Sequence, residues 1–529
     1  MFNSIRNLII YISFCLCIIE TSADNSYPVY PYLKFTYQGE EVEISTDYAN
    51  GALYSVEEPE TNVFDIWPYA EDEYRSGWVW LKSFTRPGEW DATGFCFNFR
   101  MTGCKDKKIK INIHIKETRD KNTVSYMCSN PDFPVFSYDG ETWNRMEQKT
   151  LSDHPTKEYW RIISFEYTYT KDTVYIAFQY PYSSARLDML IEKIKASPYC
   201  SIGKAGISTE GKDIKMISIT DPDIDIKDKK VVWFTGLQHS SELAAGRGLE
   251  AMINFLLSND TYARKAREYY LFKIIPLVNI DAVDEGRGRA HSTGRNLNRE
   301  WINTYPKLEV ASIKQTFSDW FYNGNRFDIF IDFHGFSGIN GDWQITSPDY
   351  NYISSQEKEY KLLLGSIQKY FPYSYYGKNS IVGTACDAVY EECGALSFTI
   401  DGWIYDRPRP SKVANLYSYY DQGHQIFALE DCQICAENYI KAFVDYAHMS
   451  WKTDIKTEEP EPIRLMQNYP NPFNSDTTIC YILPETCQVS VDIFNVTGQL
   501  VTTLIDDMSQ PGYFRVIWDG RNTNGKKVE

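Results

Sequence analysis

Residues 231–257 read VVWFTGLQHSSELAAGRGLEAMINFLL, and the fold prediction rests on this stretch. The apolar run Val231–Phe234 is typical of a buried strand, because it is short and rich in β-branched and aromatic residues. The apolar residues that follow have the spacing of one face of a helix: Leu249, Met252, Ile253, Leu256 and Leu257. A strand followed directly by a helix predicts an α/β unit.

The same alternation continues along the chain. Further strands are expected at residues 271–278, 329–333 and 396–400, and further helices at residues 310–321, 360–370 and 439–447. This pattern predicts an α/β domain with a mixed, largely parallel sheet that is flanked by helices. We place this domain at residues 198–451.

A histidine and a carboxylate follow the first of these strands. His239-Ser-Ser-Glu242 comes directly after the predicted strand at residues 231–234, and open α/β sheets bind ligands at the carboxyl ends of their strands. An imidazole and a carboxylate three residues apart reach one ion from a single turn. An isolated pair of this kind is a weak signal, because it is also typical of a solvated turn.

A second segment strengthens the metal interpretation. Asp332-Phe-His334 ends the predicted strand at residues 329–333. With His239 and Glu242, His334 completes a set of two histidines and one carboxylate, which matches a catalytic zinc site that keeps one position for water. Asp332 points to the same side of its strand as His334, so we expect it to orient one of the ligands. A hydrogen-bonded histidine at a strand end is the alternative.

Between the two ligand segments lies a loop with four arginines in 13 residues: Arg287, Arg289, Arg295 and Arg299. In an acidic protein with a formal net charge of −17, a solvated basic loop is one interpretation. Beside a zinc site, guanidinium groups instead suit a carboxylate or a developing oxyanion. The loop is preceded by Asn279-Ile-Asp-Ala282 and contains Gly294-Arg-Asn-Leu-Asn-Arg299.

Taken together, these motifs resemble the zinc carboxypeptidases of the pancreatic carboxypeptidase type. The resemblance is strongest to the cytosolic carboxypeptidase branch, which is known for trimming glutamates from tubulin. In that branch the asparagine motif runs without a gap through an arginine to a Gly-Arg-Asp-Leu-Asn-Arg motif, and the same register here gives Arg289. Trp143-Asn-Arg145 and residues 172–182 resemble the β-domain that precedes the peptidase there. The resemblance therefore covers roughly residues 60–450.

The resemblance implies a role for each matching residue. His239, Glu242 and His334 would bind one zinc ion per chain. Arg289 would stabilise the oxyanion. Asn298 and Arg299 would hold the terminal carboxylate of the substrate.

This chain departs from the family at the catalytic base. The family keeps a glutamate at the end of a strand in a Thr-x-Glu setting, where this chain has Thr399-Ile-Asp401. Asp401 is our candidate for the base, although it is one methylene shorter, and a misplacement near 1 Å costs about 100-fold in rate. Glu391 and Glu392 are the alternatives, and their position before Gly394 suggests a loop. A second departure, Asn279-Ile-Asp-Ala282 in place of Asn-Pro-Asp-Gly, alters a turn.

The N-terminal part of the chain has a different character. Arg6, an apolar run at residues 8–19 and the small residues at 21–23 predict a signal peptide over residues 1–23. An uncleaved membrane anchor is the alternative. No other stretch approaches the ~18 apolar residues of a membrane span, so we expect no span in the mature chain. Residues 24–197 read as short strands and predict an all-β domain, a sandwich.

The C-terminal part predicts a linker and a small module. Residues 452–467 include an acidic, proline-containing linker. Residues 468–529 open with Tyr-Pro-Asn-Pro-Phe-Asn, contain expected strands at 477–482, 489–494 and 514–518, and resemble the Ig-like FlgD-like repeats and type IX secretion sorting domains. The closing strand of those modules is absent, so we interpret this one as incomplete. The resemblance implies attachment to a secretion machinery or to the cell surface.

Ten cysteines remain after the predicted signal peptide, and an exported protein can form disulfides. Cys96 with Cys104, Cys386 with Cys393, and Cys480 with Cys487 are locally spaced, but spacing alone does not fix the pairing. Cys432-Gln-Ile-Cys435 resembles half of a zinc knuckle, yet no second motif of this kind accompanies it.

The sequence therefore predicts a secreted or cell-surface zinc metallocarboxypeptidase that acts on the C-termini of peptides or proteins. In this hypothesis zinc polarises the scissile carbonyl and activates a water molecule, and Asp401 takes and returns the proton. The acidic charge and the lack of a basic block argue against nucleic acid as a partner. A zinc-containing peptide binder without turnover and a cell-wall amidase or endopeptidase remain alternatives. Gly335-Phe-Ser-Gly338 is not a Gly-x-Ser-x-Gly elbow, which argues against a serine hydrolase.

Overall fold

The structure, a computed structural model, describes residues 34–528 with several gaps. The positions outside the description are 74–78, 83–93, 117–133, 147–148, 158–159, 289–290, 304, 336–343, 349–355, 372–374, 379–382, 402–428, 452–463, 466–476, 484–485, 496 and 511, in addition to 1–33 and 529. The chain divides into two compact units, Met1–Ala447 and His448–Glu529. The predicted signal peptide, residues 1–23, lies outside the described residues.

The N-terminal region is β-rich, as predicted, and contains two larger sheets and a smaller one. The six-stranded sheet has the order β1 (Thr36–Gln38), β2 (Glu43–Ser45), β8 (Asn98–Thr102), β14 (Val174–Ala177), β10 (Val135–Ser137), β11 (Trp143–Arg145). The five-stranded sheet has the order β12 (Lys149–Asp153), β13 (Trp160–Thr168), β9 (Lys108–Lys116), β4 (Val63–Trp67), β3 (Ser55–Glu60). The small sheet joins β6 (Val79–Lys82), β5 (Tyr69–Glu73) and β7 (Gly94–Cys96).

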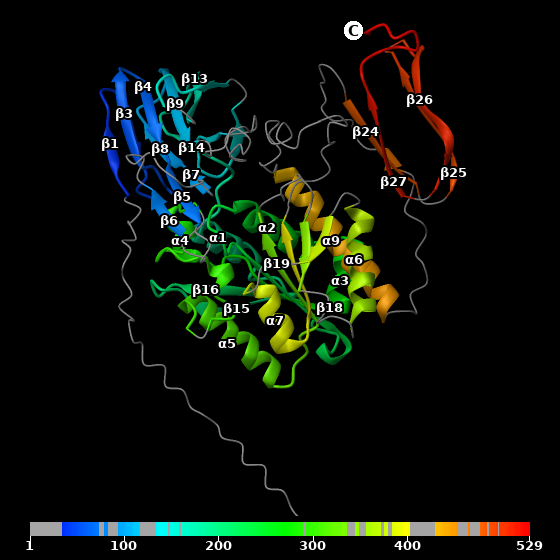
Figure 1. Ribbon diagram of the computed structural model, residues 1–529. Helices are drawn as coiled ribbons and strands as arrows, with labels where there is room; N and C mark the ends of the chain where they lie inside the picture. The colour runs from blue at the N-terminus through cyan, green and yellow to red at the C-terminus, as the bar shows by residue number, and fades with distance from the viewer. Residues whose placement is uncertain are drawn as a thin grey trace, which may run out of the picture. The chain divides into compact units, whose positions relative to one another are not determined.

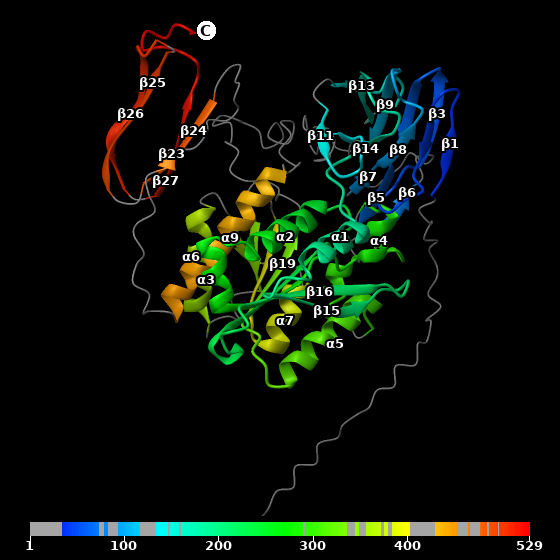
Figure 2. The ribbon, with the colours of Figure 1, turned by 180° about the vertical axis from the view of Figure 1, so that it is seen from behind.

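The core of this β-rich region follows from alternation along its strands. Ile109, Ile111 and Ile113 of β9 are fully buried, whereas Lys110 is exposed and Asn112 is half-buried, as a strand with one face on a core requires. The two larger sheets lie side by side in both views (Figures 1 and 2).

An eight-stranded mixed sheet forms the centre of the α/β part. Its order is β15 (Cys200–Ile207), β16 (Asp213–Ile219), β18 (Tyr270–Ile275), β17 (Lys230–Gly236), β19 (Ile329–His334), β22 (Leu396–Asp401), β20 (Gln344–Ser347), β21 (Tyr375–Lys378). The four central strands β18, β17, β19 and β22 are parallel, whereas β16 and β20 join them antiparallel. The predicted α/β fold with a mixed sheet is confirmed, and its parallel part is the centre.

Helices cover both faces of this sheet. They are α1 (Ser184–Ile194), α2 (Leu243–Leu256), α3 (Thr261–Tyr269), α4 (Ile280–Glu285), α5 (Leu308–Tyr322), α6 (Glu357–Tyr370), α7 (Ala385–Cys393) and α9 (Leu429–Ser450). Two 3-10 turns, η1 (Ile226–Asp228) and η2 (Leu297–Arg299), complete the described helical segments. In both views α3, α6 and α9 lie together at one side of the sheet (Figures 1 and 2).

Consecutive residues of β17 show how the two faces are filled. The Trp233 ring packs on Phe317 of α5, with ring centroids 4.9 Å apart. Phe234 points the other way and packs on Phe443 of α9, at 5.7 Å. Because both faces are covered, the central strands are mostly apolar, which explains why they read as hydrophobic runs.

Several hydrogen bonds join the β-rich region and α1 to the helices of the α/β part. The Asn50 side-chain amide donates to the Val283 carbonyl of α4 at 2.7 Å. At the start of α1, the Ser184 hydroxyl donates to the Asp284 carboxylate at 2.6 Å. Arg186 makes two hydrogen bonds of 2.8 Å to Glu250 of α2. The β-rich region therefore packs on the elements that surround the carboxyl ends of the central strands.

The C-terminal unit contains two small sheets. One joins β23 (Arg464–Leu465), β24 (Thr477–Leu483) and β27 (Gly512–Trp518), and the other joins β25 (Cys487–Phe494) and β26 (Leu500–Ser509). The three expected strands correspond to β24, β25 and β27, whereas β26 was not expected. β23 lies inside the predicted linker, residues 452–467. The Ig-like assignment stays a prediction.

The three locally spaced cysteine pairs are wrong as disulfide candidates. Cys104 and Cys487 carry free thiols, so neither is bridged to its candidate partner, Cys96 or Cys480. Cys386 and Cys393 carry free thiols near opposite ends of α7, so this candidate pair is not bridged. Cys432 and Cys435 are buried free thiols on α9. Within the described part of the chain, no helix has the length and apolar character needed to cross a membrane.

Candidate metal centre

The predicted ligands meet at the carboxyl ends of β17 and β19. β17 ends at Gly236, and the chain then turns through residues 237–242, which we call the ligand turn, before α2 begins. His239 and Glu242 come from this turn, and His334 is the last residue of β19. Since parallel neighbours end at the same edge, the sheet brings segments 95 residues apart to one place.

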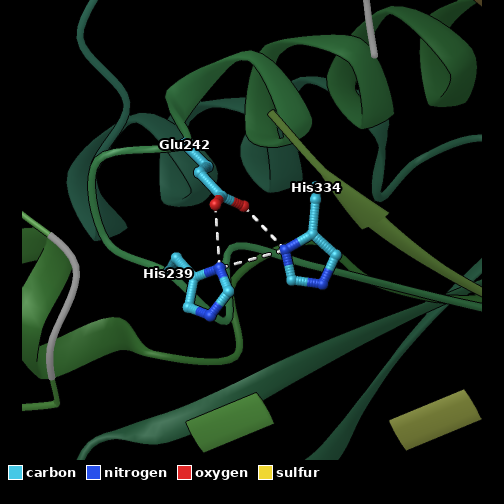
Figure 3. Close-up of side chains that lie close together, drawn as sticks. All are labelled: His239, Glu242 and His334. Atoms are coloured by element: carbon cyan, nitrogen blue, oxygen red, sulfur yellow. Dashed lines mark hydrogen bonds and ion pairs between the residues drawn. The ribbon is translucent and has the colours of Figure 1, made fainter. Parts of the chain in front are cut away.

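Three potential ligand atoms converge in this cluster (Figure 3). His239 Nδ1 lies 2.8 Å from Glu242 Oε1, and His334 Nδ1 lies 2.7 Å from Glu242 Oε2. The two Nδ1 atoms lie 3.1 Å apart. All three side chains are buried, and among the described residues they are the one group of this kind.

Hydrogen bonds on the far side of each ring explain why the ligand atoms face one another. His239 Nε2 lies 2.9 Å from Asn296 Oδ1, and His334 Nε2 lies 2.8 Å from Asp332 Oδ2. Each acceptor favours the tautomer with the proton on Nε2, which leaves a lone pair on Nδ1. Two lone pairs and a carboxylate then point at one position without a donor between them. This donor set fits a zinc ion.

The protonation states of Glu242 and His334 depend on each other. Burial alone would raise the pKa of Glu242, but the His239 and His334 rings lower this pKa well below its ordinary value. Burial alone would lower the pKa of His334, but the carboxylates of Asp332 and Glu242 raise it well above its ordinary value. A cation and a proton therefore compete for the same lone pairs, so metal affinity is expected to fall at low pH.

Asp332 is itself fixed from two sides. Its carboxylate accepts a hydrogen bond from the Thr235 hydroxyl at 2.7 Å and another from the Gln238 side-chain amide. The side-chain oxygen of Gln238, Oε1, in turn accepts from the Trp301 indole N–H at 2.7 Å. The predicted orienting role of Asp332 therefore agrees with its place in the structure, next to His334.

The close approach of β19 to the ligand turn requires a glycine. A Cβ on Gly335 would lie 2.7 Å from the Glu242 carbonyl oxygen and 2.9 Å from its Cα. The backbone N–H of Gly335 also lies 3.3 Å from Glu242 Oε2, to which it donates. Glycine lets the two backbones come close enough for His334 and Glu242 to share one position.

Asn298 and Arg299, from the loop that contains the four arginines, lie at the same edge of the sheet. Asn298 is buried, accepts a hydrogen bond from the Ala385 N–H at 3.1 Å, and has its amide nitrogen 3.0 Å from His334 Nε2. Arg299 is half-buried and donates to the Asn298 carbonyl at 2.8 Å. Arg289 lies outside the described residues. The roles of these three residues toward a substrate stay predictions.

Asp401 ends the strand next to His334. β19 and β22 are parallel, and their register pairs His334 with Asp401. Neighbouring strands lie about 4.8 Å apart, so the proposed base belongs to the same edge as the ligands. Its catalytic role stays a prediction.

The alternative bases lie elsewhere, and their predicted loop is wrong. Glu391 and Glu392 belong to the last turn of α7, which ends at Gly394 with a left-handed φ of 66°. Glu391 is exposed, and Glu392 accepts a hydrogen bond from Ser318 of α5. The helix was foreseeable, because Thr384 and Asp387 form a capping box and Gly394 is a typical C-terminal cap.

Two functional residues were missed by the sequence interpretation. Asn296 holds His239, and Gln238 links Asp332 to Trp301. Asn296 lies inside the quoted Gly294–Arg299 motif. This motif was already expected near the metal ligands, so the sequence did offer a signal for Asn296. Gln238 directly precedes His239, but nothing in the sequence indicates which side chain it contacts.

Comparisons with known proteins agree with this geometry. A family model described as zinc carboxypeptidase matches residues 188–440. Cytosolic carboxypeptidase 6 of Mus musculus is 29% identical over 210 residues, which is 37% of this chain and 38% of that protein. Cytosolic carboxypeptidase 2 of Danio rerio is 28% identical over 193 residues, or 34% of this chain and 26% of that protein. The chain thus matches less than half the length of these relatives.

A solved structure extends the likeness beyond the matched segment. The crystal structure of a metallo-carboxypeptidase from Burkholderia cenocepacia aligns with a TM-score of 0.58 and 18% identity, covering 77% of this chain and 99% of that chain. At this identity the likeness concerns the fold, which includes a carboxypeptidase-like α/β part. The predicted family is confirmed: residues 188–440 form a domain of the zinc carboxypeptidase family, related to the cytosolic carboxypeptidases.

Proposed function

We propose that this protein is an exported zinc metallocarboxypeptidase, which removes C-terminal residues from peptides or proteins. The observation that carries the proposal is the convergence of His239 Nδ1, His334 Nδ1 and the Glu242 carboxylate on one position. It occurs within the segment that the zinc carboxypeptidase family model matches. A solvated turn, the alternative for the histidine and glutamate pair, does not account for three buried ligand groups.

The three side chains would hold one zinc ion. When bound, such an ion polarises a carbonyl and makes a water molecule more acidic. The chain's own groups have separate tasks. Asp332 and Asn296 keep the two imidazoles in the tautomer that ligates. Asp401 would accept a proton at its carboxylate and return it to the leaving amine.

The arginine loop supports a substrate with a free carboxylate. Arg299 is half-buried beside Asn298, at the edge where the ligands lie. A guanidinium group pairs with a carboxylate through two parallel hydrogen bonds, an arrangement that lysine cannot copy. Arg289 would stabilise the oxyanion. A free C-terminus is therefore the chemistry that these residues fit, and this argues against an amidase or an endopeptidase.

Export and attachment of the protein are also part of the proposal. Residues 1–23 would act as a signal peptide, and residues 468–529 would attach the protein to a secretion machinery or to the cell surface. Export should yield a mature chain that starts at Asp24. Mass spectrometry of the secreted protein measures this directly, and retention of residues 1–23 would favour the membrane anchor.

A mixed peptide library tests the activity. The purified protein should shorten free-acid peptides from their C-termini, and a chelator should abolish this trimming. Matched peptides with amidated C-termini are the control, and they should stay intact because they lack the carboxylate. Equal cleavage of amidated and free-acid peptides would instead support the amidase or endopeptidase. A protein that is inert on every peptide would contradict the proposed activity.

One observation favours a second candidate, a zinc-containing peptide binder. The strand next to His334 ends in Asp401, where the family keeps a glutamate, so the carboxylate is one methylene shorter. Asp401→Asn should lower turnover roughly 100-fold or more and leave zinc bound, if Asp401 is the base. Should the parent be inert while Asp401→Glu trims peptides, the binder is the better description. Unchanged turnover in Asp401→Asn would exclude Asp401 as the base.

A further inference from the structure

The ligand turn is a strained segment that the sheet does not support. Leu237, its first residue, has a left-handed φ of 56° although it is not a glycine, and its side chain is fully buried. A branched residue adopts this conformation only where its surroundings impose it. The strained Leu237 lies two residues before His239. Contacts from outside the turn must therefore hold the backbone that carries this ligand.

The carbonyl of Ser241 shows where the turn leaves regular structure. In a continuous helix it would accept from the Ala245 N–H, but that N–H donates to the Glu242 carbonyl at 3.0 Å. Ser241 is buried, between the two ligands of the turn. A buried carbonyl needs a donor, and helix α2 does not supply one.

The donor comes from the β-rich region. The side-chain amide of Gln179 donates to the Ser241 carbonyl. Gln179 is 7% exposed and follows the end of β14, where the Phe178 N–H donates to the Phe97 carbonyl at 2.8 Å. This amide is therefore anchored to the six-stranded sheet. It lies outside residues 188–440, the segment matched by the family model.

Tyr182 supports the same turn by packing. Its ring carbons lie 2.7 and 2.8 Å from the place where a Cβ on Gly246 would be, and a methyl group of Leu237 lies 2.6 Å from that place. The Tyr182 ring and the Leu237 side chain thus meet on the bare backbone of α2. The β-rich region contacts the turn at its strained first residue, Leu237, and at Ser241, directly before Glu242.

We propose that Gln179 is a positioning residue for the ligand turn, so that the β-rich region forms part of the metal centre. Its amide holds the Ser241 carbonyl and thereby fixes the separation of His239 and Glu242. This inference rests on the proposed zinc site. It goes further by assigning part of the metal affinity to a contact from another region of the fold.

Gln179→Glu is the test variant. It keeps the size of the side chain, removes the N–H donor and places an oxygen opposite the Ser241 carbonyl. The full mature chain is titrated with zinc in competition with a chromophoric chelator. We expect the dissociation constant for zinc to rise about 10-fold or more, the range found when partners of metal ligands are lost. Gln179→Met removes the donor without adding a charge and serves if Gln179→Glu does not fold.

Gln356→Glu is the matched control. The Gln356 amide also donates to a backbone carbonyl, that of Gly394, at 2.6 Å and in an exposed position. The same change there should leave zinc affinity unaltered. Thermal unfolding of the metal-free proteins separates positioning from stability, since a purely structural role would lower the melting temperature and leave the dissociation constant unchanged.

The outcomes are distinct from those of the proposed function. Equal zinc affinity in the parent and in Gln179→Glu or Gln179→Met overturns the inference, and so does an equal loss in Gln356→Glu. A parent that binds no zinc overturns both the site and the inference. A parent that binds zinc without trimming peptides contradicts the proposed activity only, and the zinc titration still decides the role of Gln179.

Discussion

The ligand turn and the end of β19 present side chains of the same kind, but different forces hold them. β19 pairs with β17 on one side and β22 on the other, so the backbone ladder itself positions His334. The ligand turn has left the ladder, and it is held by hydrogen bonds from Asn279 and Gln179 and by packing of Tyr182. A metal centre can therefore join one ligand fixed by secondary structure to two fixed by tertiary contacts.

Removal of His334, the ligand positioned by strand pairing, should have the largest effect on zinc affinity. His334→Ala deletes one of the three ligand atoms and should lower zinc affinity by more than the roughly 100-fold that marks the loss of a partner residue. Because β19 stays paired on both sides, the fold should survive. Zinc content after dialysis measures this. His154→Ala, in the β-rich region, is the control and should retain zinc, whereas full retention in His334→Ala would remove His334 from the site.

Gly335→Ala tests the contact between the two regions. The added methyl group would lie 2.7 Å from the Glu242 carbonyl oxygen, so the turn and the strand end must move apart. We expect zinc affinity to fall by about 10- to 100-fold, measured by chelator competition. Gly365→Ala is the matched control, since nothing lies within 4 Å of its added Cβ on α6. It should stabilise the helix by about 0.5–1 kcal/mol. Equal zinc affinity in both variants would show that the close approach is not needed.

The hydrogen-bond partners of the two histidines differ in charge, so substitutions that change these charges test how each partner affects zinc affinity. Asn296→Asp gives His239 a charged acceptor, which should make the imidazole a stronger donor of its lone pair and tighten zinc binding by about 10-fold. Asp332→Asn makes the opposite change at His334 and should weaken binding by about 10-fold. Zinc dissociation constants measure both. Shifts in the same direction would contradict this account of the two partners.

A charged residue in the sheet should affect stability and leave the site unchanged. Lys273 of β18 is 6% exposed, its Nζ lies 4.0 Å from the Trp320 ring centroid and 5.0 Å from that of Trp233, and burial lowers its pKa from 10.5 to about 8. The unfolded state therefore binds more protons between pH 8 and 10.5, so stability rises with pH in this window and the full penalty applies below it.

Lys273→Met removes that penalty. The variant should be more stable than the parent at pH 7 by about 3 kcal/mol at most, and the difference should shrink as the pH approaches 10.5. Denaturant unfolding at several pH values measures it, with zinc affinity as the control that should not move. A difference that does not depend on pH would mean that packing, and not the charge, causes it.

The α/β pattern and the three candidate ligands could be predicted from the sequence. Buried strands must be apolar on both faces, so Val231–Phe234 and Ile329–Phe333 are visible as continuous runs. The ligands follow these runs directly, and strand ends of a parallel sheet meet at one edge. Local caps were also encoded, since Thr384 and Gly394 define α7, even though the interpretation missed them. The strand β26 was not predicted, because its sequence includes Asp506 and Asp507 and lacks a clear apolar alternation.

The contacts that hold the ligands could not be predicted from the sequence, because they depend on tertiary packing. Whether Asn296 faces His239, or Gln179 reaches Ser241, depends on how loops and strands distant in sequence pack. The strain at Leu237 is equally invisible in the sequence, where the residue is an ordinary leucine after a strand. The reason is physical: side-chain type and spacing express local preferences. A hydrogen bond between residues 62 positions apart exists only after the chain has paid the entropy of bringing two regions together.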